Sequence, residues 1–197
     1  VVRGSYHSVV IVDMPFGSYE ASPQQAFASA SRILAETGAA GVKLEGGEAM
    51  ADTIAFLSQR GIPVMAHIGL TPQAVNALGG YGARGKSEAE HAKIVGDARA
   101  VASAGAFAMV VEGVMEELAD LITDTVAVPV IGIGASARCD GQVLVAEDML
   151  GMFERTPRFV KRYGAMAETI SDAAARYAAD VRSRAFPTDD QVYRPKK

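Results

Sequence analysis

The sequence predicts an α/β fold with a parallel sheet, and three observations support this. Short runs rich in β-branched residues alternate along the chain with longer stretches of helical periodicity. Alternation of this kind joins parallel strands through crossover helices. The runs are almost continuously apolar, as in strands covered on both faces. Six such runs occur, whereas a closed barrel of this class has eight strands, so the pattern fits either an open sheet or a barrel with two β/α units missing before Val1.

The first elements have clear boundary signals. The run "SVVIVDMP" at 8–15 is short and β-branched, so it is predicted to be a strand. In the helix that follows, Ser22 suits the N-cap, Pro23 the first helical position and Gly38 the C-cap. The next strand is predicted at 41–46, where "GVKLEG" ends on two charged residues and a glycine.

The rest of the chain repeats this order. The segments predicted next are a helix at 48–61, a strand at 62–69, a glycine-rich loop at 79–86, a helix at 87–105, a strand at 106–113, a helix at 115–125, strands at 128–136 and 142–147, and helical structure at 158–185. Pro187 is expected to end the last helix. Because nothing like a linker or repeat divides the chain, residues 1–197 are expected to form a single domain.

Composition excludes several classes of protein. The 197 residues are 49% hydrophobic and 21% charged, with a net charge of −4 and no basic patch, so nucleic acid is not an expected partner. No apolar run approaches the roughly 18 residues that span a membrane. Cys139 is the only cysteine and is expected to be a small, semi-buried hydrophobic residue. A reducing compartment, and hence the cytoplasm, is the expected location.

Four successive predicted strands end in ionisable side chains: Asp13, Lys43 with Glu45, His67, and Glu112. Lys43 and Glu45 are two residues apart and so face the same side of their strand. In parallel α/β folds the carboxyl ends of the strands form the floor of the active site. Each residue alone has a structural explanation, such as a turn cap or an ion pair. Together they predict a polar pocket, because buried charges are costly unless they pair or bind something.

The chemistry of this set favours a hard divalent cation. The sequence has no Ser-His-Asp order, no Cys/His zinc spacing and no Walker loop. Carboxylates without cysteines suit Mg²⁺, which could chelate a 2-oxo acid and stabilise an enolate as a Lewis acid. A separate base would then be needed for proton abstraction. The glycine-rich "GIGAS" at 132–136 is only weak support for phosphate binding.

Seven motifs in order resemble one enzyme family. They are "DMPFGSY", "VKLEGG", "HIGLTPQ", "GGYGARGK", "VVEGV", "VPVIGIGA" and "DGQVLV", and the similarity runs from about residue 1 to 186. The chain closely resembles the ketopantoate hydroxymethyltransferase family. The resemblance implies a (β/α)8 TIM barrel of the phosphoenolpyruvate-utilising type. It also implies transfer of a one-carbon unit from 5,10-methylenetetrahydrofolate to 3-methyl-2-oxobutanoate, giving 2-dehydropantoate through a Mg²⁺-stabilised enolate.

The resemblance also assigns roles to individual residues. Asp13 matches a metal-binding carboxylate that also lies against substrate, and Glu45 matches the second metal carboxylate. Lys43 and His67 match substrate-pocket residues. Glu112 matches the general base. Glu112 is flanked by Met109 and Val111, which are expected to make its surroundings apolar.

The chain departs from the family pattern in two respects. The family barrel begins two strands earlier, so residues 1–197 would hold strands 3–8 and the C-terminal helices, with about 65–80 further residues expected upstream. That upstream segment supplies an Asp-Ser pair at the metal and substrate site. In addition, Ser136 and Glu147 stand where the family commonly has Gly and a His or Gln.

Two other functions remain open. One is a metal-dependent carbon–carbon lyase acting on a 2-oxo acid in the same barrel superfamily. Such lyases typically place a cysteine or another acid on a mobile loop, and the loop at 79–86 has no cysteine. The other is a catalytically dead barrel kept for binding or assembly, against which the retained ionisable residues argue. The family resemblance implies a homo-oligomer, decameric in well-known members.

Overall fold

The computed structural model describes residues 1–195, which divide into two compact units. The first is Val1–Val143; the second is Leu144–Lys197, whose last two residues lie outside the described part. Each unit is described separately. The strand–helix alternation predicted from the sequence is found in the first unit.

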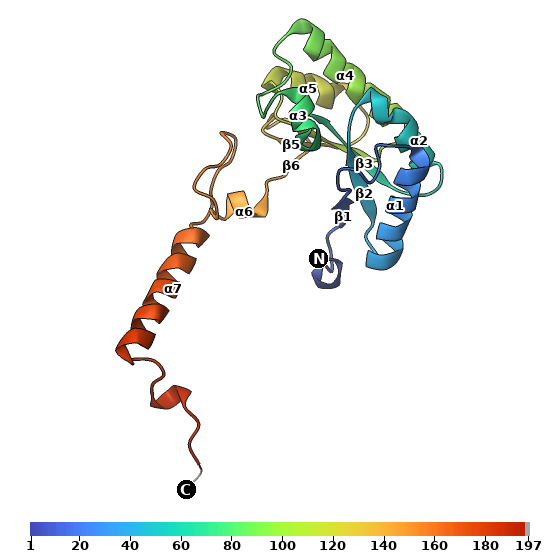
Figure 1. Cartoon of the computed structure of the whole chain (residues 1–197). Helices are drawn as coiled ribbons and strands as arrows, with labels where there is room; N and C mark the ends of the chain where they lie inside the picture. The colour runs from blue at the N-terminus through green and yellow to red at the C-terminus, as the bar shows by residue number, and fades with distance from the viewer. Residues whose placement is uncertain (196–197) are drawn as a thin grey trace. The chain divides into compact units, whose positions relative to one another are not determined.

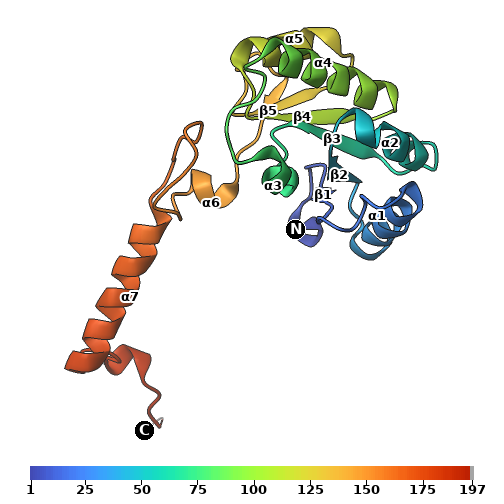
Figure 2. The ribbon, with the colours of Figure 1, turned by 45° about the horizontal axis from the view of Figure 1, so that its top comes forward.

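The described part of the first unit contains a six-stranded parallel sheet whose spatial order follows chain order, β1-β2-β3-β4-β5-β6 (Figures 1 and 2). The strands are β1 Ile11–Asp13, β2 Gly41–Glu45, β3 Val64–Gly69, β4 Ala108–Glu112, β5 Val130–Ile133 and β6 Gly141–Gln142. Because every neighbouring pair of strands runs parallel, all the carboxyl ends lie at one edge of the sheet.

Helices connect the strands, and the ends of the first helix follow the predicted signals. They are α1 Pro23–Thr37, α2 Ala51–Ser58, α3 Val75–Leu78, α4 Glu88–Ser103 and α5 Glu116–Thr125, with 3₁₀ turns at Val2–Gly4, Glu48–Met50 and Pro72–Ala74. The Ser22 side chain accepts a hydrogen bond from Gln25 N, and Gly38 ends α1 in the left-handed conformation at φ 71°. Both caps predicted for α1 are therefore confirmed.

The two faces of the strands differ in character. Alternate strand residues share one buried core with α1, α2, α4 and α5; on the strands these are Val42, Leu44, Val64, Ala66, Ile68, Met109, Val111 and Val130. Since side chains alternate along a strand, Lys43, Glu45, His67 and Glu112 point to the opposite face. Figure 2 shows α1, α2, α4 and α5 together on the core face of the sheet.

The region around 142–147 differs from its prediction as a strand. Only Gly141–Gln142 pairs as a strand, and Ala146–Met149 forms the short helix α6. A short apolar run such as "QVLVAE" does not by itself distinguish strand from helix. Glu147 and Asp148 lie in the first turn of α6, where negative charge is favourable. The predicted strand was therefore wrong over most of its length.

In the second unit the principal element is α7, Met166–Ser183, so the helix predicted at 158–185 begins later than expected. No residue of α7 is buried, and its apolar residues Ile170, Tyr177 and Val181 are exposed. A 3₁₀ turn at Asp189–Gln191 follows. None of the helices within residues 1–195 combines the length and apolar composition that a bilayer crossing requires.

Candidate functional site

Five ionisable side chains gather on one face of the sheet near the carboxyl ends of β1 to β4. They are Asp13, Lys43, Glu45, His67 and Glu112. The strand register explains their proximity, because Asp13 pairs with Lys43 and Glu45 pairs with His67 across neighbouring strands. Glu112 pairs with Gly69, two residues beyond His67. The parallel register thus brings the predicted cluster together.

Lys43, on β2, contacts one residue of the cluster on β1 and one on β3. Its Nζ lies 2.7 Å from Asp13 Oδ1 and 3.1 Å from His67 Nδ1. The Lys43 side chain is largely buried, whereas that of Asp13 is about half exposed. An ammonium group has three donors, so these two contacts leave one N–H of Lys43 for a further acceptor.

His67 lies between Lys43 and Glu112. It is 3% exposed, and its Nε2 is 3.1 Å from Glu112 Oε2. The two atoms are close but not aligned as a hydrogen bond, so Nε2 has no formed hydrogen bond within residues 1–195. Met109 and Val111 belong to the core on the other face, so the prediction that they would make the surroundings of Glu112 apolar was wrong.

Glu45 is the most deeply buried carboxylate of the cluster. Its Oε2 accepts a hydrogen bond of 2.9 Å from Gln73 N, while Oε1 is 3.7 Å from His67 Nδ1, beyond hydrogen-bond distance. Burial raises the pKa of Glu45 above its usual range, and the Gln73 hydrogen bond and the charge of Lys43 offset only part of this effect. Glu45 is therefore a desolvated carboxylate close to a second one, Asp13.

Two residues without a predicted role hold Glu45 in place. The Tyr19 hydroxyl donates to Gln73 Oε1 at 2.7 Å and accepts from Glu45 N at 3.2 Å. Gln73 Nε2 in turn donates to Met14 O at 2.9 Å. Burial raises the pKa of Tyr19 to about 12. Both residues lie in motifs that support the family resemblance, "DMPFGSY" and "HIGLTPQ", which was the only signal for them in the sequence.

The donor set of this cluster fits Mg²⁺. The ion is commonly held by one or two protein carboxylates, its other positions being filled by water and substrate oxygens. Asp13 and Glu45 supply such a pair, although no group of three His, Cys, Asp or Glu side chains suited to a metal occurs in the part of the chain that the structure describes. A divalent cation beside Glu45 would also favour the ionised form that burial disfavours. The two carboxylates are thus chemically suited to the ion.

Ser136 has a structural role in the loop after β5. Its Oγ donates a 2.5 Å hydrogen bond to Asp120 Oδ1 on α5 and accepts from Arg138 N. Arg138 also bridges Asp120 and Asp124. Cys139 is 8% exposed and packs in the core, which confirms its predicted character. Ser136 therefore fastens this loop to α5.

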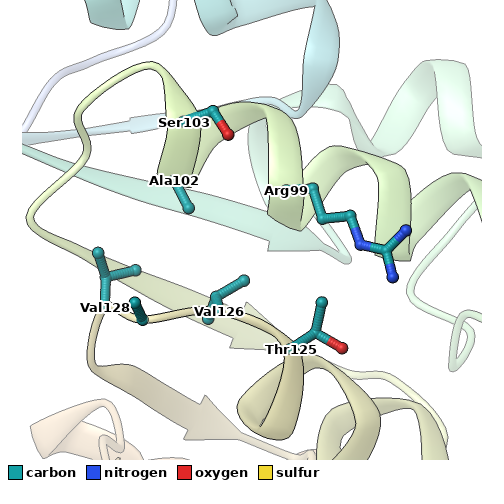
Figure 3. A pocket seen from close by; sticks show the side chains of 7 residues that line it. Arg99, Ala102, Ser103, Thr125, Val126 and Val128 are labelled. Atoms are coloured by element: carbon teal, nitrogen blue, oxygen red, sulfur yellow. The ribbon is translucent and has the colours of Figure 1, made fainter.

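A hollow of about 270 Å³ lies away from the cluster (Figure 3). One side is α4, with Arg99, Ala102 and Ser103, and the other is the chain between α5 and β5, residues 125–128. The segment 125–128 leads into the amino end of β5, which lies at the edge of the sheet opposite the charged residues. Among the described residues, Arg99 is the one ionisable residue that lines this hollow, so the hollow has none of the carboxylates that the cluster offers to a metal ion.

Comparisons with known proteins give a consistent result. Residues 1–189 match a family model described as ketopantoate hydroxymethyltransferase. A protein of Novosphingobium aromaticivorans named 3-methyl-2-oxobutanoate hydroxymethyltransferase is 74% identical over 196 residues, covering 100% of this chain and 68% of the relative. A protein of the same name from Erythrobacter litoralis is 70% identical with the same coverage.

A more distant relative and one solved structure complete the comparisons. The Rhodospirillum rubrum protein named 3-methyl-2-oxobutanoate hydroxymethyltransferase is 61% identical over 194 residues, covering 98% of this chain and 70% of its own. A solved structure from Burkholderia cenocepacia J2315 has a TM-score of 0.48 at 20% identity, covering 90% of this chain and 72% of its own. The sequence relatives, at 61% identity or more, are far closer than this structure.

Proposed function

Because this chain belongs to the ketopantoate hydroxymethyltransferase family, we propose that it transfers a hydroxymethyl group to 3-methyl-2-oxobutanoate, giving 2-dehydropantoate for pantothenate synthesis. The donor is 5,10-methylenetetrahydrofolate. The sheet is proposed to be part of an eight-stranded barrel of the phosphoenolpyruvate-utilising type, which the chain-order arrangement of β1 to β6 supports. We also propose that the enzyme works in the cytoplasm as a homo-oligomer.

One observation chiefly supports this reaction: the carboxylates form two separate groups. Asp13 and Glu45 lie on β1 and β2, whereas Glu112 lies on β4 and contacts His67. A metal site needs ionised carboxylates with free oxygens, and a base needs a carboxylate that is not bound to the metal. The arrangement provides both within one cluster.

Asp13 and Glu45 would hold Mg²⁺. When bound there, the ion would act as a Lewis acid toward the keto oxygen of the substrate. The free N–H of Lys43 would bind an oxygen of the oxo acid, and its charge would offset the negative charge that develops. Glu112 would accept the C3 proton of 3-methyl-2-oxobutanoate, and the electron pair left at C3 would form a bond to the folate-borne carbon. The bonds from that carbon to the folate nitrogens would break, leaving tetrahydrofolate, and water would supply the hydroxyl oxygen of the hydroxymethyl group.

The Glu112→Gln variant tests the role of the base. It should lower the exchange of the C3 proton with D₂O, followed by NMR without folate, by about 10²–10⁴-fold. Binding of the oxo acid should change little, because glutamine preserves the shape of the side chain. Exchange at the wild-type rate in this variant would remove Glu112 from the mechanism.

The overall reaction is tested with the full-length protein and both substrates. Formation of 2-dehydropantoate that depends on 5,10-methylenetetrahydrofolate is the expected result. Cleavage of a 2-oxo acid without folate would instead support the lyase alternative. Binding of ligand without turnover would support the catalytically inactive alternative.

A further inference from the structure

We propose that His67 is a positioning residue: Lys43 holds it in one tautomer, and its ring N–H then orients the carboxylate of Glu112. The inference rests on the proposed function, because it assigns His67 a place in that reaction. It replaces the role predicted from the sequence, in which His67 contacts the substrate.

The contact with Lys43 assigns the tautomer. Lys43 Nζ lies 3.1 Å from His67 Nδ1, and an ammonium group can only donate. Nδ1 must therefore accept through its lone pair, which leaves the ring proton on Nε2. A doubly protonated ring would instead place an N–H against the ammonium group of Lys43. The same Nδ1 is 3.7 Å from Glu45 Oε1, too far for a hydrogen bond that would favour the other tautomer.

The proton on Nε2 faces Glu112. Nε2 is 3.1 Å from Glu112 Oε2 and makes no formed hydrogen bond elsewhere within residues 1–195. A buried N–H without an acceptor is costly, so rotation of Glu112 into alignment is favourable. The neighbouring backbone is fixed by the β3–β4 ladder, in which His67 pairs with Val110 and Gly69 pairs with Glu112.

Two consequences follow for the chemistry. His67 has no lone pair free to accept a proton, because Lys43 occupies Nδ1 and Nε2 carries hydrogen. His67 is therefore not the base in this arrangement. Glu112 has one oxygen held by His67, which leaves the other oxygen directed by that contact toward the substrate proton.

A matched pair of variants distinguishes positioning from base catalysis. In His67→Gln the longer amide can place an N–H near the position of Nε2, although it cannot act as a base. In His67→Asn the shorter amide reaches only the region of Nδ1, so it cannot donate a hydrogen bond to the Glu112 carboxylate. If His67 positions Glu112, the Asn variant should lose about 10²-fold in C3 proton exchange, and the Gln variant should stay within about 10-fold of wild type. KM for the oxo acid should change little in either variant.

Nitrogen NMR of the wild-type protein provides a readout that does not depend on turnover. With ¹⁵N-labelled histidine, His67 should show a protonated Nε2 and an unprotonated Nδ1. The chain has three histidines, and the signals of His67 are identified by their loss in the Asn variant. If that variant does not fold, the His67→Gln variant serves to assign the signals of His67.

The outcomes separate the two proposals. A protonated Nδ1, equal losses in both variants, or no loss in either would overturn the positioning role. A wild-type protein that shows the Nε2–H tautomer but makes no 2-dehydropantoate would overturn the proposed function and leave the tautomer assignment standing. The Nε2–H tautomer with selective loss in the Asn variant supports both.

Discussion

The hydroxyl group of Tyr19 makes two hydrogen bonds that fix the end of β2. It donates to Gln73 and accepts from the backbone N–H of Glu45, at a position only 1% exposed. A group this deeply buried resists ionisation, so the pKa of Tyr19 rises to about 12 from an ordinary value of 10.0. Ionisation of this side chain should therefore contribute to the loss of stability at alkaline pH.

We expect Tyr19→Phe to remove part of that alkaline pH dependence. Between pH 10 and about 12 the unfolded chain loses the Tyr19 proton while the folded chain keeps it. The unfolded state thus binds fewer protons, and the free energy of unfolding falls as pH rises, by about 2–3 kcal/mol over the whole range. Below pH 10 this contribution is fully present. The variant should lack this part of the slope.

The measurement is urea unfolding at several pH values from 8 to about 11.5, compared between wild type and variant. At pH 8 the variant should be less stable by about 1–3 kcal/mol, because Gln73 and the backbone of Glu45 lose a buried partner. Tyr6→Phe is the control, since Tyr6 is 86% exposed and should leave the slope unchanged. Identical slopes for Tyr19→Phe and wild type would contradict the argument.

The end of strand β3 shows how one element positions the catalytic candidate on the next. Gly69 has φ +90°, and a Cβ built there would lie 2.5 Å from Glu112 O and 2.7 Å from Val114 Cγ1. Leu70 N donates to the same carbonyl oxygen of Glu112 at 2.8 Å. Glycine is required here because the backbones of β3 and β4 approach closely beside Glu112.

Gly69→Ala should therefore destabilise the protein by more than the left-handed backbone conformation alone would cause. Left-handed conformation costs a non-glycine residue about 1–2 kcal/mol. Gly17→Ala isolates this cost, because Gly17 has φ +87° and nothing within 4 Å of its added Cβ. Gly69→Ala should lower the free energy of unfolding by at least about 1 kcal/mol more than Gly17→Ala does. It should also lower the rate of C3 proton exchange, by displacing Glu112. Equal losses in the two variants would show that the close approach is unimportant.

Metal binding should couple the charged cluster to the stability of the whole protein. Lys43 offsets one carboxylate, but Glu45 remains buried with a raised pKa. A ligand that binds only the folded state stabilises it by mass action, by about 2.7 kcal/mol at a concentration 100 times its Kd. Mg²⁺ binding is thus measurable without any assay of activity.

We expect Mg²⁺ to raise the unfolding temperature of the full-length protein, and a chelator to reverse the change. Asp13→Asn should remove most of this response, because it removes the charge of one of the two proposed ligands. Glu36→Gln is the control, since Glu36 is an exposed carboxylate that pairs with Arg32 on α1. A response to Mg²⁺ that is the same in Asp13→Asn as in wild type would exclude Asp13 as a ligand.

The order and type of most elements of the first unit could be predicted from the amino-acid sequence. Alternating apolar runs and helical patterns predicted the strands, and Ser22 and Gly38 marked the ends of α1. The ionisable residues at four successive strand ends could also be predicted to meet, because the carboxyl ends of parallel strands share one edge. These properties depend on local spacing, which a single sequence contains.

The individual contacts between side chains could not be predicted, because they depend on how distant parts of the chain pack together. Tyr19 and Gln73 are 54 residues apart, and their hydrogen bond depends on how two loops pack, which periodicity does not encode. The position of His67 between Lys43 and Glu112 depends on the register of three strands. The strand predicted at 142–147 was found only at Gln142, and a short helix begins at Ala146, because a short run of this kind is compatible with either structure. Hydrogen-bond partners and register are long-range properties, and they form only when the whole sheet and its loops are assembled.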